Sequence, residues 1–334
     1  MICFGNFGEQ FNIIEAMESL TGVVHRTPLK QSSTLNSLTG AKVYMKMENL
    51  QRTGSFKLRG AYNKIASLND LEAKKGIVAA SAGNHAQGVA FAASNRGIRS
   101  KIFMPEQTPF SKIEATKSYG AEIVLHGESY QEAFLAARKE QERNGSTFVH
   151  AFDDPHVIAG QGTVALEMLQ QSSDLEEIIV PVGGGGLISG VALAIKSFYP
   201  GVKVTGVQSA GAAATYNRFN GSGEDSLRTV RSIADGIAVK EPGKVTFPLI
   251  HQLVDDIVTV TDEEIAYSIV FMLEREKTLV EGAGAAALAA LFSKKQRYEQ
   301  KRVGIIVSGG NTDLDKLAFY KELSKKVNPL KKIS

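Results

Sequence analysis

Lys57 is the residue of this chain whose type and surroundings point most directly to covalent chemistry. It lies in the stretch 51–62, between the aromatic Phe56 and the opening of an expected helix. A lysine amine forms a Schiff base with an aldehyde only when part of it is unprotonated, so it needs a desolvated site or nearby positive charge to lower its pKa. Arg59 and the helix start would both act in that direction. Because a lysine in a first helical turn is usually solvated, this interpretation needs support from other parts of the chain.

Three further stretches, at 81–88, 183–187 and 308–311, carry residues that packing alone does not explain. The second consists of Gly183, Gly184, Gly185, Gly186 and Leu187. Glycines between a strand and a helix present backbone N–H groups at a helix N-terminus, where a phosphate finds donors and positive potential. A glycine-rich turn can also be purely structural. A dinucleotide fingerprint would need another glycine at Ile188 or Ser189, so the pattern favours a different phosphate-bearing cofactor.

In order and spacing, the four stretches resemble the pyridoxal-phosphate (PLP) enzymes of the tryptophan-synthase-β-like fold, also called fold type II. The amino-acid sequences at 51–57, 81–88, 158–163 and 234–236 resemble the motifs of the threonine/serine dehydratase family. Within that family the chain is closest to the short catabolic threonine dehydratases, or threonine ammonia-lyases. The resemblance runs from about residue 20 to about residue 316.

The resemblance implies that pyridoxal 5'-phosphate is the cofactor and that Lys57 carries it covalently. Phe56 would pack on the cofactor ring, and the glycine stretch at 183–187 would hold the phosphate. Ser308 would be the partner of the pyridine nitrogen. A hydroxyl, unlike a carboxylate, does not force that nitrogen to be protonated, which suits elimination of a β-leaving group better than transamination.

The stretch that follows residue 80 is expected to bind the substrate carboxylate through backbone groups at a helix start. Its residues are Ser81, Ala82, Gly83, Asn84 and His85. Asn84 can donate to the phenolate oxygen of the cofactor, and a role as helix N-cap stays open beside that one. Gly236 is a further substrate-binding residue that the resemblance implies.

The implied activity is elimination of water from L-threonine to give 2-oxobutanoate and ammonia, with L-serine giving pyruvate. The amine of Lys57 would act as general base on the Cα proton. Serine racemase-type racemisation is the nearest alternative, because Ser81 could offer a proton on the face opposite Lys57. β-Replacement, as in cysteine synthases, and a PLP-carrying binding protein without catalysis are further alternatives that the motifs favour less.

The similarity to the short catabolic branch also implies an AMP effector bound at a subunit interface, in a homodimer or homotetramer. The corresponding positions are Arg52, Thr53, Gln87, Tyr119 and Asn311, which could instead support the active site. Because little of the chain follows residue 314, we expect no isoleucine-binding regulatory domain of the kind that biosynthetic threonine dehydratases carry. Gln208, Ala212 and Ala214 occupy positions where related racemases carry carboxylates, so we expect no metal requirement.

The elements that must position these residues follow a βα rhythm. The expected strands are 42–47, 77–80, 101–104, 122–125, 147–150, 178–181, 203–207, 257–260 and 303–307. The expected helices are 15–20, 85–96, 109–119, 130–143, 155–170, 187–198 and 283–292, with another after a capping box at Thr261. Short strands alternating with helices predict an α/β fold of two parallel-sheet domains with helices on both faces. We place the large PLP-binding domain at 1–50 and 154–334 and the small α/β domain at 51–153.

Composition restricts the remaining function classes. A chain of 334 residues can form two domains, and a net charge of +3 gives no nucleic-acid footprint. Among the six histidines and the single cysteine, Cys3, no metal-ligand spacing occurs. The N-terminus lacks a basic stretch followed by an apolar run, and no segment is suited to cross a membrane. We therefore expect a cytoplasmic protein.

Overall fold

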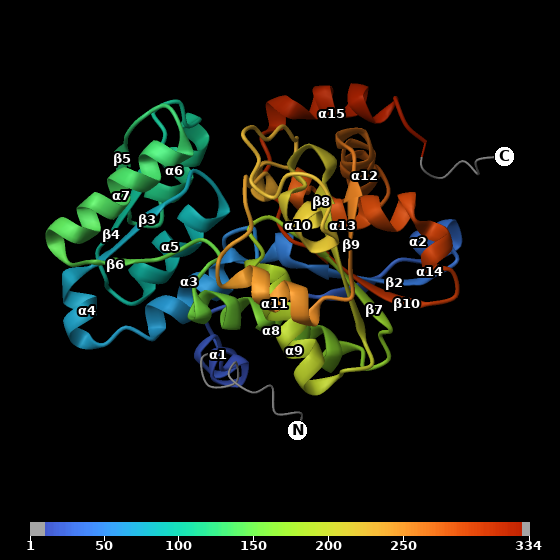
Figure 1. Cartoon of the computed structure of the whole chain (residues 1–334), viewed down its shortest axis with the longest axis horizontal. Helices are drawn as coiled ribbons and strands as arrows, with labels where there is room; N and C mark the ends of the chain where they lie inside the picture. Colours follow the sequence, from blue (N-terminus) through green and yellow to red (C-terminus); the bar gives the residue numbers. More distant parts are fainter. Residues whose placement is uncertain (1–10, 329–334) are drawn as a thin grey trace.

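A computed structural model of the chain describes residues 11–328. Within them the strands form two separate sheets, which lie at opposite ends of the elongated molecule (Figure 1). Cys3 lies outside the described residues.

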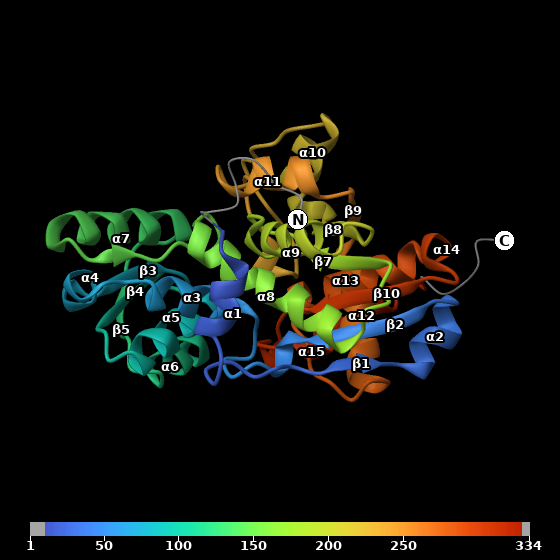
Figure 2. The ribbon, with the colours of Figure 1, turned by 90° about the horizontal axis from the view of Figure 1, so that it is seen from below.

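The larger sheet has six strands in the order β1-β2-β10-β7-β8-β9. Its strands are β1 (Leu29–Gln31), β2 (Lys42–Met47), β10 (Arg302–Val307), β7 (Glu177–Pro181), β8 (Lys203–Ser209) and β9 (Asp256–Val260). All pair in parallel except β1, which runs antiparallel to β2 at the edge. Buried strands of a parallel sheet need apolar cover on both faces, and helices provide it here (Figure 2).

Two apolar clusters cover this sheet, one on each face. The first cluster involves α2 (Ser33–Thr39), α12 (Asp262–Glu274), α13 (Gly282–Ser293), α14 (Lys295–Tyr298) and α15 (Leu317–Ser324). The second involves α1 (Ile13–Ser19), α8 (Pro155–Gln171), α9 (Gly186–Phe198), α10 (Ala214–Asn220) and α11 (Thr246–Leu253).

The smaller sheet has four parallel strands in the order β5-β4-β3-β6. They are β5 (Glu122–Leu125), β4 (Ser100–Met104), β3 (Ile77–Ala80) and β6 (Thr147–Phe148). Its helices are α3 (Lys57–Ala66), α4 (Asp70–Lys75), α5 (Asn84–Asn95), α6 (Phe110–Lys117) and α7 (Tyr130–Asn144). Successive strand residues point to opposite faces, so Ile77 and Ala79 join the cluster with α3 and α5, whereas Val78 and Ala80 pack against α7.

The predicted strands and long helices are present, and each end lies within two residues of its predicted position. The capping box at Thr261 is confirmed, because its hydroxyl accepts from Glu264 N and the Glu264 carboxylate accepts from Thr261 N. Six short helices, α2, α4, α10, α11, α14 and α15, were not predicted. In α11, Pro248 falls in the first turn, where a missing N–H costs nothing, although in the sequence it resembles a helix breaker.

The domain division stays a proposal, which the sheet memberships support. Strands of the small sheet come from within 51–153, and strands of the large sheet come from the two flanking parts. The two parts touch closely where α3 packs on α8, since Gly60 and Gly160 approach within backbone contact.

The strand order brings the predicted stretches together. In the large sheet, β2, β10 and β7 are neighbours, and each strand is followed by one of the predicted stretches. These stretches are 51–57 after β2, 308–311 after β10 and 183–187 after β7. In the small sheet the neighbours β3 and β6 precede the stretches 81–88 and 149–154. Ligands of open parallel sheets bind at the carboxyl ends of the strands, so this edge is the candidate site.

No helix within residues 11–328 is long and apolar enough to span a membrane. Localisation in the cytoplasm stays a prediction.

Candidate active site

A short pairing of two loops places Lys57 beside the end of β10. Phe56 N donates to Ser308 O at 3.2 Å, and Gly310 N donates to Gly54 O at 2.9 Å, with Ser55 and Gly309 bridging between them. Gly54 has φ of 72° and no room for a side chain, because a Cβ there would lie 2.4 Å from the Asn311 amide oxygen. Lys57 and Ser308 are thereby brought together from opposite parts of the chain.

Lys57 begins α3, and its amine is partly neutral at physiological pH. Nζ donates to Ala151 O at 2.8 Å and lies 5.4 Å from the centre of the Phe56 ring. Burial lowers the pKa of Lys57 to about 8, opposed by the charge of Glu281. An amine with this pKa can condense with an aldehyde without a strong base.

Arg59 does not act as expected. Its guanidinium, which is fully buried, pairs with Glu48 and Glu167, each at 2.8 Å. Lys46 adds a 2.7 Å contact to Glu167. Burial, rather than the Arg59 charge, therefore lowers the pKa of Lys57, and the guanidinium instead ties α3 to α8 and to the end of β2.

The glycine loop at 183–187 presents N–H groups that the protein does not use. Thr246 Oγ1 donates to Gly184 O at 2.6 Å and Thr215 Oγ1 donates to Gly183 O at 3.4 Å, which turns the loop carbonyls toward the protein. Within residues 11–328, the N–H groups of Gly183, Gly184 and Gly185 have no protein acceptor. Leu187 lies in the first turn of α9, directly behind the loop. This arrangement suits a phosphate at a helix N-terminus.

The stretch at 81–85 forms a turn that opens α5. Ser81 Oγ accepts from Gly83 N at 3.2 Å, and Gly83 is the helix N-cap. The alternative of Asn84 as N-cap is therefore wrong, since Asn84 is the first residue of the helix. Ala82, between Ser81 and Gly83, is partly exposed. The hydroxyl of Ser81 and the amine of Lys57 make their hydrogen bonds to other groups, and the racemisation role of Ser81 stays a prediction.

His85 is held neutral below the turn. Its Nε2 lies 2.9 Å from Val149 O, and burial lowers the pKa of His85 to about 3. A neutral imidazole there avoids a second positive charge next to Lys57.

Glu281 is a site residue that sequence reasoning missed. Its Oε1 accepts from Asn84 Nδ2 at 2.6 Å, and burial raises the pKa of Glu281 to about 7. The available signal was its place directly before the glycine-rich opening of α13, a helix that was itself predicted. Gly236 lies between this carboxylate and the glycine loop, because a Cβ on Gly236 would be 3.9 Å from Glu281 Oε1 and Gly236 O lies 3.5 Å from the position of a Cβ on Gly183.

Ser308 has a hydroxyl with no hydrogen-bond partner within residues 11–328, and the residue is only 2% exposed. A pyridine nitrogen could pair with this hydroxyl, which is not among the fully buried side-chain atoms that lack a partner. The Ser308 hydroxyl, the partly neutral Lys57 amine and the unused N–H groups of the glycine loop together fit a pyridoxal phosphate.

Four of the five effector candidates lie next to one another. Asn311 Nδ2 donates to Thr53 O and to Asn84 Oδ1, both at 2.8 Å, and Tyr119 Oη donates to Arg52 O at 3.5 Å. Gln87 is buried one turn after Asn84 in α5.

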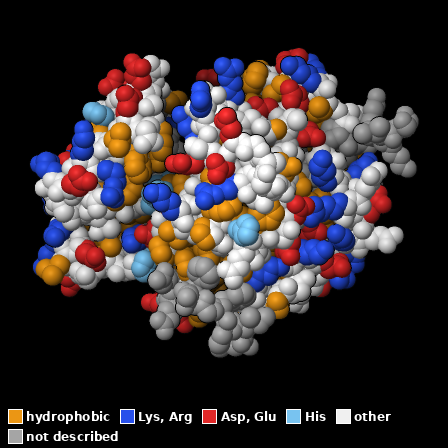
Figure 3. Space-filling view, in the orientation of Figure 1, with side chains coloured by type: hydrophobic (Ala, Val, Ile, Leu, Met, Phe, Trp, Pro, Cys, Tyr) orange, Lys and Arg blue, Asp and Glu red, His pale blue; other side chains and the backbone are white. Residues whose placement is uncertain are grey.

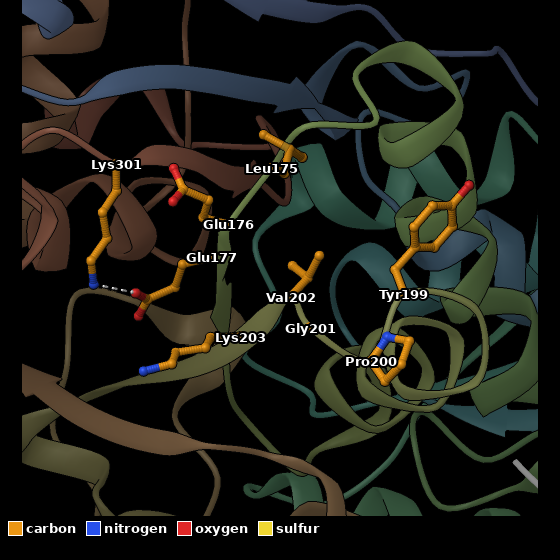
Figure 4. A pocket seen from close by; sticks show the side chains of 9 residues that line it. All are labelled: Leu175, Glu176, Glu177, Tyr199, Pro200, Gly201, Val202, Lys203 and Lys301. Atoms are coloured by element: carbon orange, nitrogen blue, oxygen red, sulfur yellow. Dashed lines mark hydrogen bonds and ion pairs between the residues drawn. The ribbon is translucent and has the colours of Figure 1, made fainter.

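One cavity lies away from these residues and is lined by none of them. It has a volume of about 440 Å³ and lies at the amino ends of β7 and β8, where Lys301 pairs with Glu177 at 3.1 Å (Figure 4). Among the described residues, no cluster of three or more metal-ligating side chains occurs. On the face drawn in Figure 3, acidic and basic side chains are interspersed, while hydrophobic ones gather near the middle.

Comparison with known proteins agrees with this geometry. Residues 20–309 match the family described as "Pyridoxal-phosphate dependent enzyme", and the chain belongs to this family. Its members use pyridoxal phosphate, which is the cofactor expected from the sequence.

Two curated relatives are similar over most of their length. The L-threonine ammonia-lyase of Thermotoga maritima is 52% identical over 304 residues, which cover 91% of this chain and 76% of the relative. The catabolic L-threonine dehydratase of Escherichia coli is 44% identical over 309 residues, which cover 92% of this chain and 94% of the relative.

Two solved structures have the same fold. The processed threonine deaminase isoform 2 of Solanum lycopersicum superposes with a TM-score of 0.92 at 36% identity, covering 97% of this chain and 90% of the other. The serine racemase of maize superposes with a TM-score of 0.88 at 38% identity, covering 94% and 97%. The predicted tryptophan-synthase-β-like fold class is thereby confirmed.

Proposed function

We propose that this protein is a PLP-dependent threonine ammonia-lyase, which converts L-threonine to 2-oxobutanoate and ammonia and L-serine to pyruvate and ammonia. The observation that carries the proposal is the position of Lys57, a partly buried amine with a pKa of about 8 beside the end of β10. The two curated relatives, at 52% and 44% identity, support threonine as the substrate.

When bound, the cofactor supplies an electron-withdrawing ring that stabilises negative charge at Cα of an attached amino acid. Lys57 accepts the Cα proton at Nζ, since part of this amine is neutral near physiological pH. The backbone at the start of α5 holds the substrate carboxylate and so fixes the direction of the Cα–H bond. Over the whole reaction one water leaves from Cα and Cβ, one water is taken up, and ammonia is released.

The test is a panel of amino acids with added PLP, scored for keto acid, inverted enantiomer and thioether. Formation of 2-oxobutanoate from L-threonine supports the proposal. Formation of D-amino acid without keto acid would overturn the lyase proposal in favour of racemisation. The structural similarity to maize serine racemase is the observation that supports this alternative. Ser81→Ala separates the two activities: if Ser81 protonates the opposite face, D-amino acid disappears while most elimination stays.

We also propose that AMP regulates a homodimer or homotetramer through Arg52, Thr53, Tyr119 and Asn311, with Gln87 near them. The support is the link from Thr53 through Asn311 to Asn84. A nucleotide that prefers one assembly shifts the population toward it, so AMP should lower the apparent KM and change the sedimentation coefficient together. Arg52→Ala should weaken both responses, whereas Arg99→Ala, another exposed arginine, should not. An inert AMP in the native protein would refute this proposal and leave the lyase assignment standing.

A further inference from the structure

The segment 150–154 follows β6 and contacts two parts of the candidate site. Ala151 O accepts the hydrogen bond of Lys57 Nζ at 2.8 Å. Phe152 packs on the glycine loop, because a Cβ on Gly184 would lie 2.4 Å from its ring and a Cβ on Gly186 would lie 2.9 Å from its Cβ. The conformation of this one short turn therefore affects both the lysine and the phosphate loop.

Asp153, the next residue of the turn, attaches the turn to the backbone at 244–246. The Asp153 carboxylate accepts from three consecutive backbone N–H groups. Lys244 N donates to Oδ2 at 3.0 Å, and Val245 N and Thr246 N donate to Oδ1 at 2.8 and 3.1 Å. Thr246 is also the residue whose hydroxyl holds Gly184 O. A change in the turn would therefore affect the glycine loop through Phe152, which packs on it, and through Asp153, which holds Thr246.

The imidazole of His150 holds this turn together. Its Nδ1 accepts from Phe152 N at 3.2 Å and from Asp153 N at 2.8 Å. Because both partners are donors, Nδ1 carries no proton and the neutral ring is the Nε2–H tautomer. The ring packs edge-on against Phe152, with 4.6 Å between ring centres and an interplanar angle of 89°.

We infer that His150 is a positioning residue for cofactor binding. Its neutral Nδ1 fixes the turn that presents Ala151 O to Lys57 and holds the Phe152 ring against the glycine loop. This inference concerns cofactor binding and requires no assumption about the substrate, so it can fail while the proposed lyase activity holds.

In the protonated ring, Nδ1 carries a hydrogen and can no longer accept from Phe152 N and Asp153 N. The charged and titratable groups that face the ring are Asp153, Asp154, Lys57, Arg138 and His85. Burial lowers the pKa of His150, with Lys57 acting in the same direction and Asp153 opposing. The turn should therefore stay intact at neutral pH and loosen only on the acid side, below the ordinary histidine pKa of about 6.5.

Two substitutions separate the acceptor from the ring. In His150→Asn, the side-chain oxygen can accept from the N–H group two residues ahead, as in an Asx turn, but it does not titrate. In His150→Phe the ring stays and the acceptor is lost. His126→Asn, at an exposed histidine of the same domain, is the control.

The measurement is the dissociation constant of PLP, followed by its absorbance on titration into the apoprotein, with the melting temperature of each apoprotein as a check of folding. We expect His150→Phe to weaken PLP binding by about ten-fold or more and His150→Asn by less than about three-fold. Between about pH 7.5 and pH 5, the native protein and the His126→Asn control should lose more PLP affinity than His150→Asn does.

Native PLP affinity in His150→Phe would overturn the inference, and so would a loss in His150→Asn as large as that in His150→Phe. If His150→Phe does not fold, the pH dependence of His150→Asn decides alone, since an acid loss equal to that of the native protein contradicts a titrating acceptor at this position.

Discussion

Asn84 Nδ2 donates a 2.6 Å hydrogen bond to Glu281, 197 positions away in the sequence. The other side of the Asn84 amide is fixed by Asn311, whose Nδ2 donates both to Asn84 Oδ1 and to Thr53 O. A backbone carbonyl can only accept, so both amides have one possible orientation. The second N–H of Asn84 is then available for the phenolate oxygen that we propose it binds.

Glu281→Gln should change the pH dependence of stability. The pKa of Glu281 is about 7 in the folded protein, whereas an unfolded glutamate has about 4.3. Between these values the folded state binds a proton that the unfolded state has lost, so this residue lowers the free energy of unfolding as pH rises through that range. Glutamine does not ionise and can still accept from Asn84. We expect the variant to gain stability relative to the native protein at pH 8 but not at pH 4.5, by urea denaturation at both; an equal change at the two pH values would contradict the role of burial.

Lys57→Ala should leave a folded protein without covalent cofactor and with activity lower by several powers of ten, since the anchor and the base are one amine. Borohydride reduction followed by mass spectrometry measures the attachment. In the native protein, PLP should attach faster as pH rises through about 8, because the neutral amine is the reactive form. Lys74→Ala, at an exposed lysine, is the control. Substantial turnover by Lys57→Ala would refute the assignment of this lysine.

Gly184→Ala should weaken PLP binding, because a Cβ there would lie 2.4 Å from the Phe152 ring. Overpacking costs about 1–3 kcal/mol, which corresponds to a loss of PLP affinity of about five- to 150-fold if the whole cost falls on the bound state. Gly201→Ala is the matched control, since a Cβ at Gly201 would meet nothing within 4 Å. Titration of both apoproteins with PLP gives the comparison, and equal affinities would show that the loop can shift without loss.

Arg59→Met should destabilise the whole protein rather than only the site. It leaves Glu48 and Glu167 buried, with Lys46 as the one remaining cation of the cluster, and breaking a buried ion pair from one side costs about 3–5 kcal/mol. Arg143→Met removes an exposed pair with Glu140, which should cost at most about 1 kcal/mol. Chemical denaturation of the two variants side by side tests this difference, and a loss of the same size in both would refute it.

A chelator should leave the activity unchanged. Hard divalent cations prefer carboxylate oxygens, whereas Gln208, Ala212 and Ala214 offer none, and the Gln208 amide oxygen already accepts from Tyr216 N at 2.7 Å. The rate with L-threonine before and after EDTA measures this. A large loss that Mg²⁺ restores would show that a metal site exists outside this stretch.

The sequence alone was sufficient for the chemistry of single stretches. Lys57 beside an aromatic residue, the glycines at 183–186 and the strand–helix rhythm are local patterns, and each follows from the chemistry or periodicity of adjacent residues. These patterns predicted a Schiff-base lysine, a phosphate loop and nearly every strand of both sheets, because strand and helix periodicity depends only on residues close together in the chain. The identity of the cofactor came from the resemblance of these stretches to a known family.

Only the tertiary structure decided which distant groups meet. The order β2-β10-β7 sets Lys57 beside Ser308, and the contact of Asn84 with Glu281 joins α5 to α13 across the two sheets. Arg59 was expected to act on Lys57, but it is neutralised by Glu48 and Glu167, whose positions depend on the packing of α3 against α8. A pKa depends on burial and on charges within a few ångströms, and these are set by contacts between residues far apart in the chain, which no local pattern encodes.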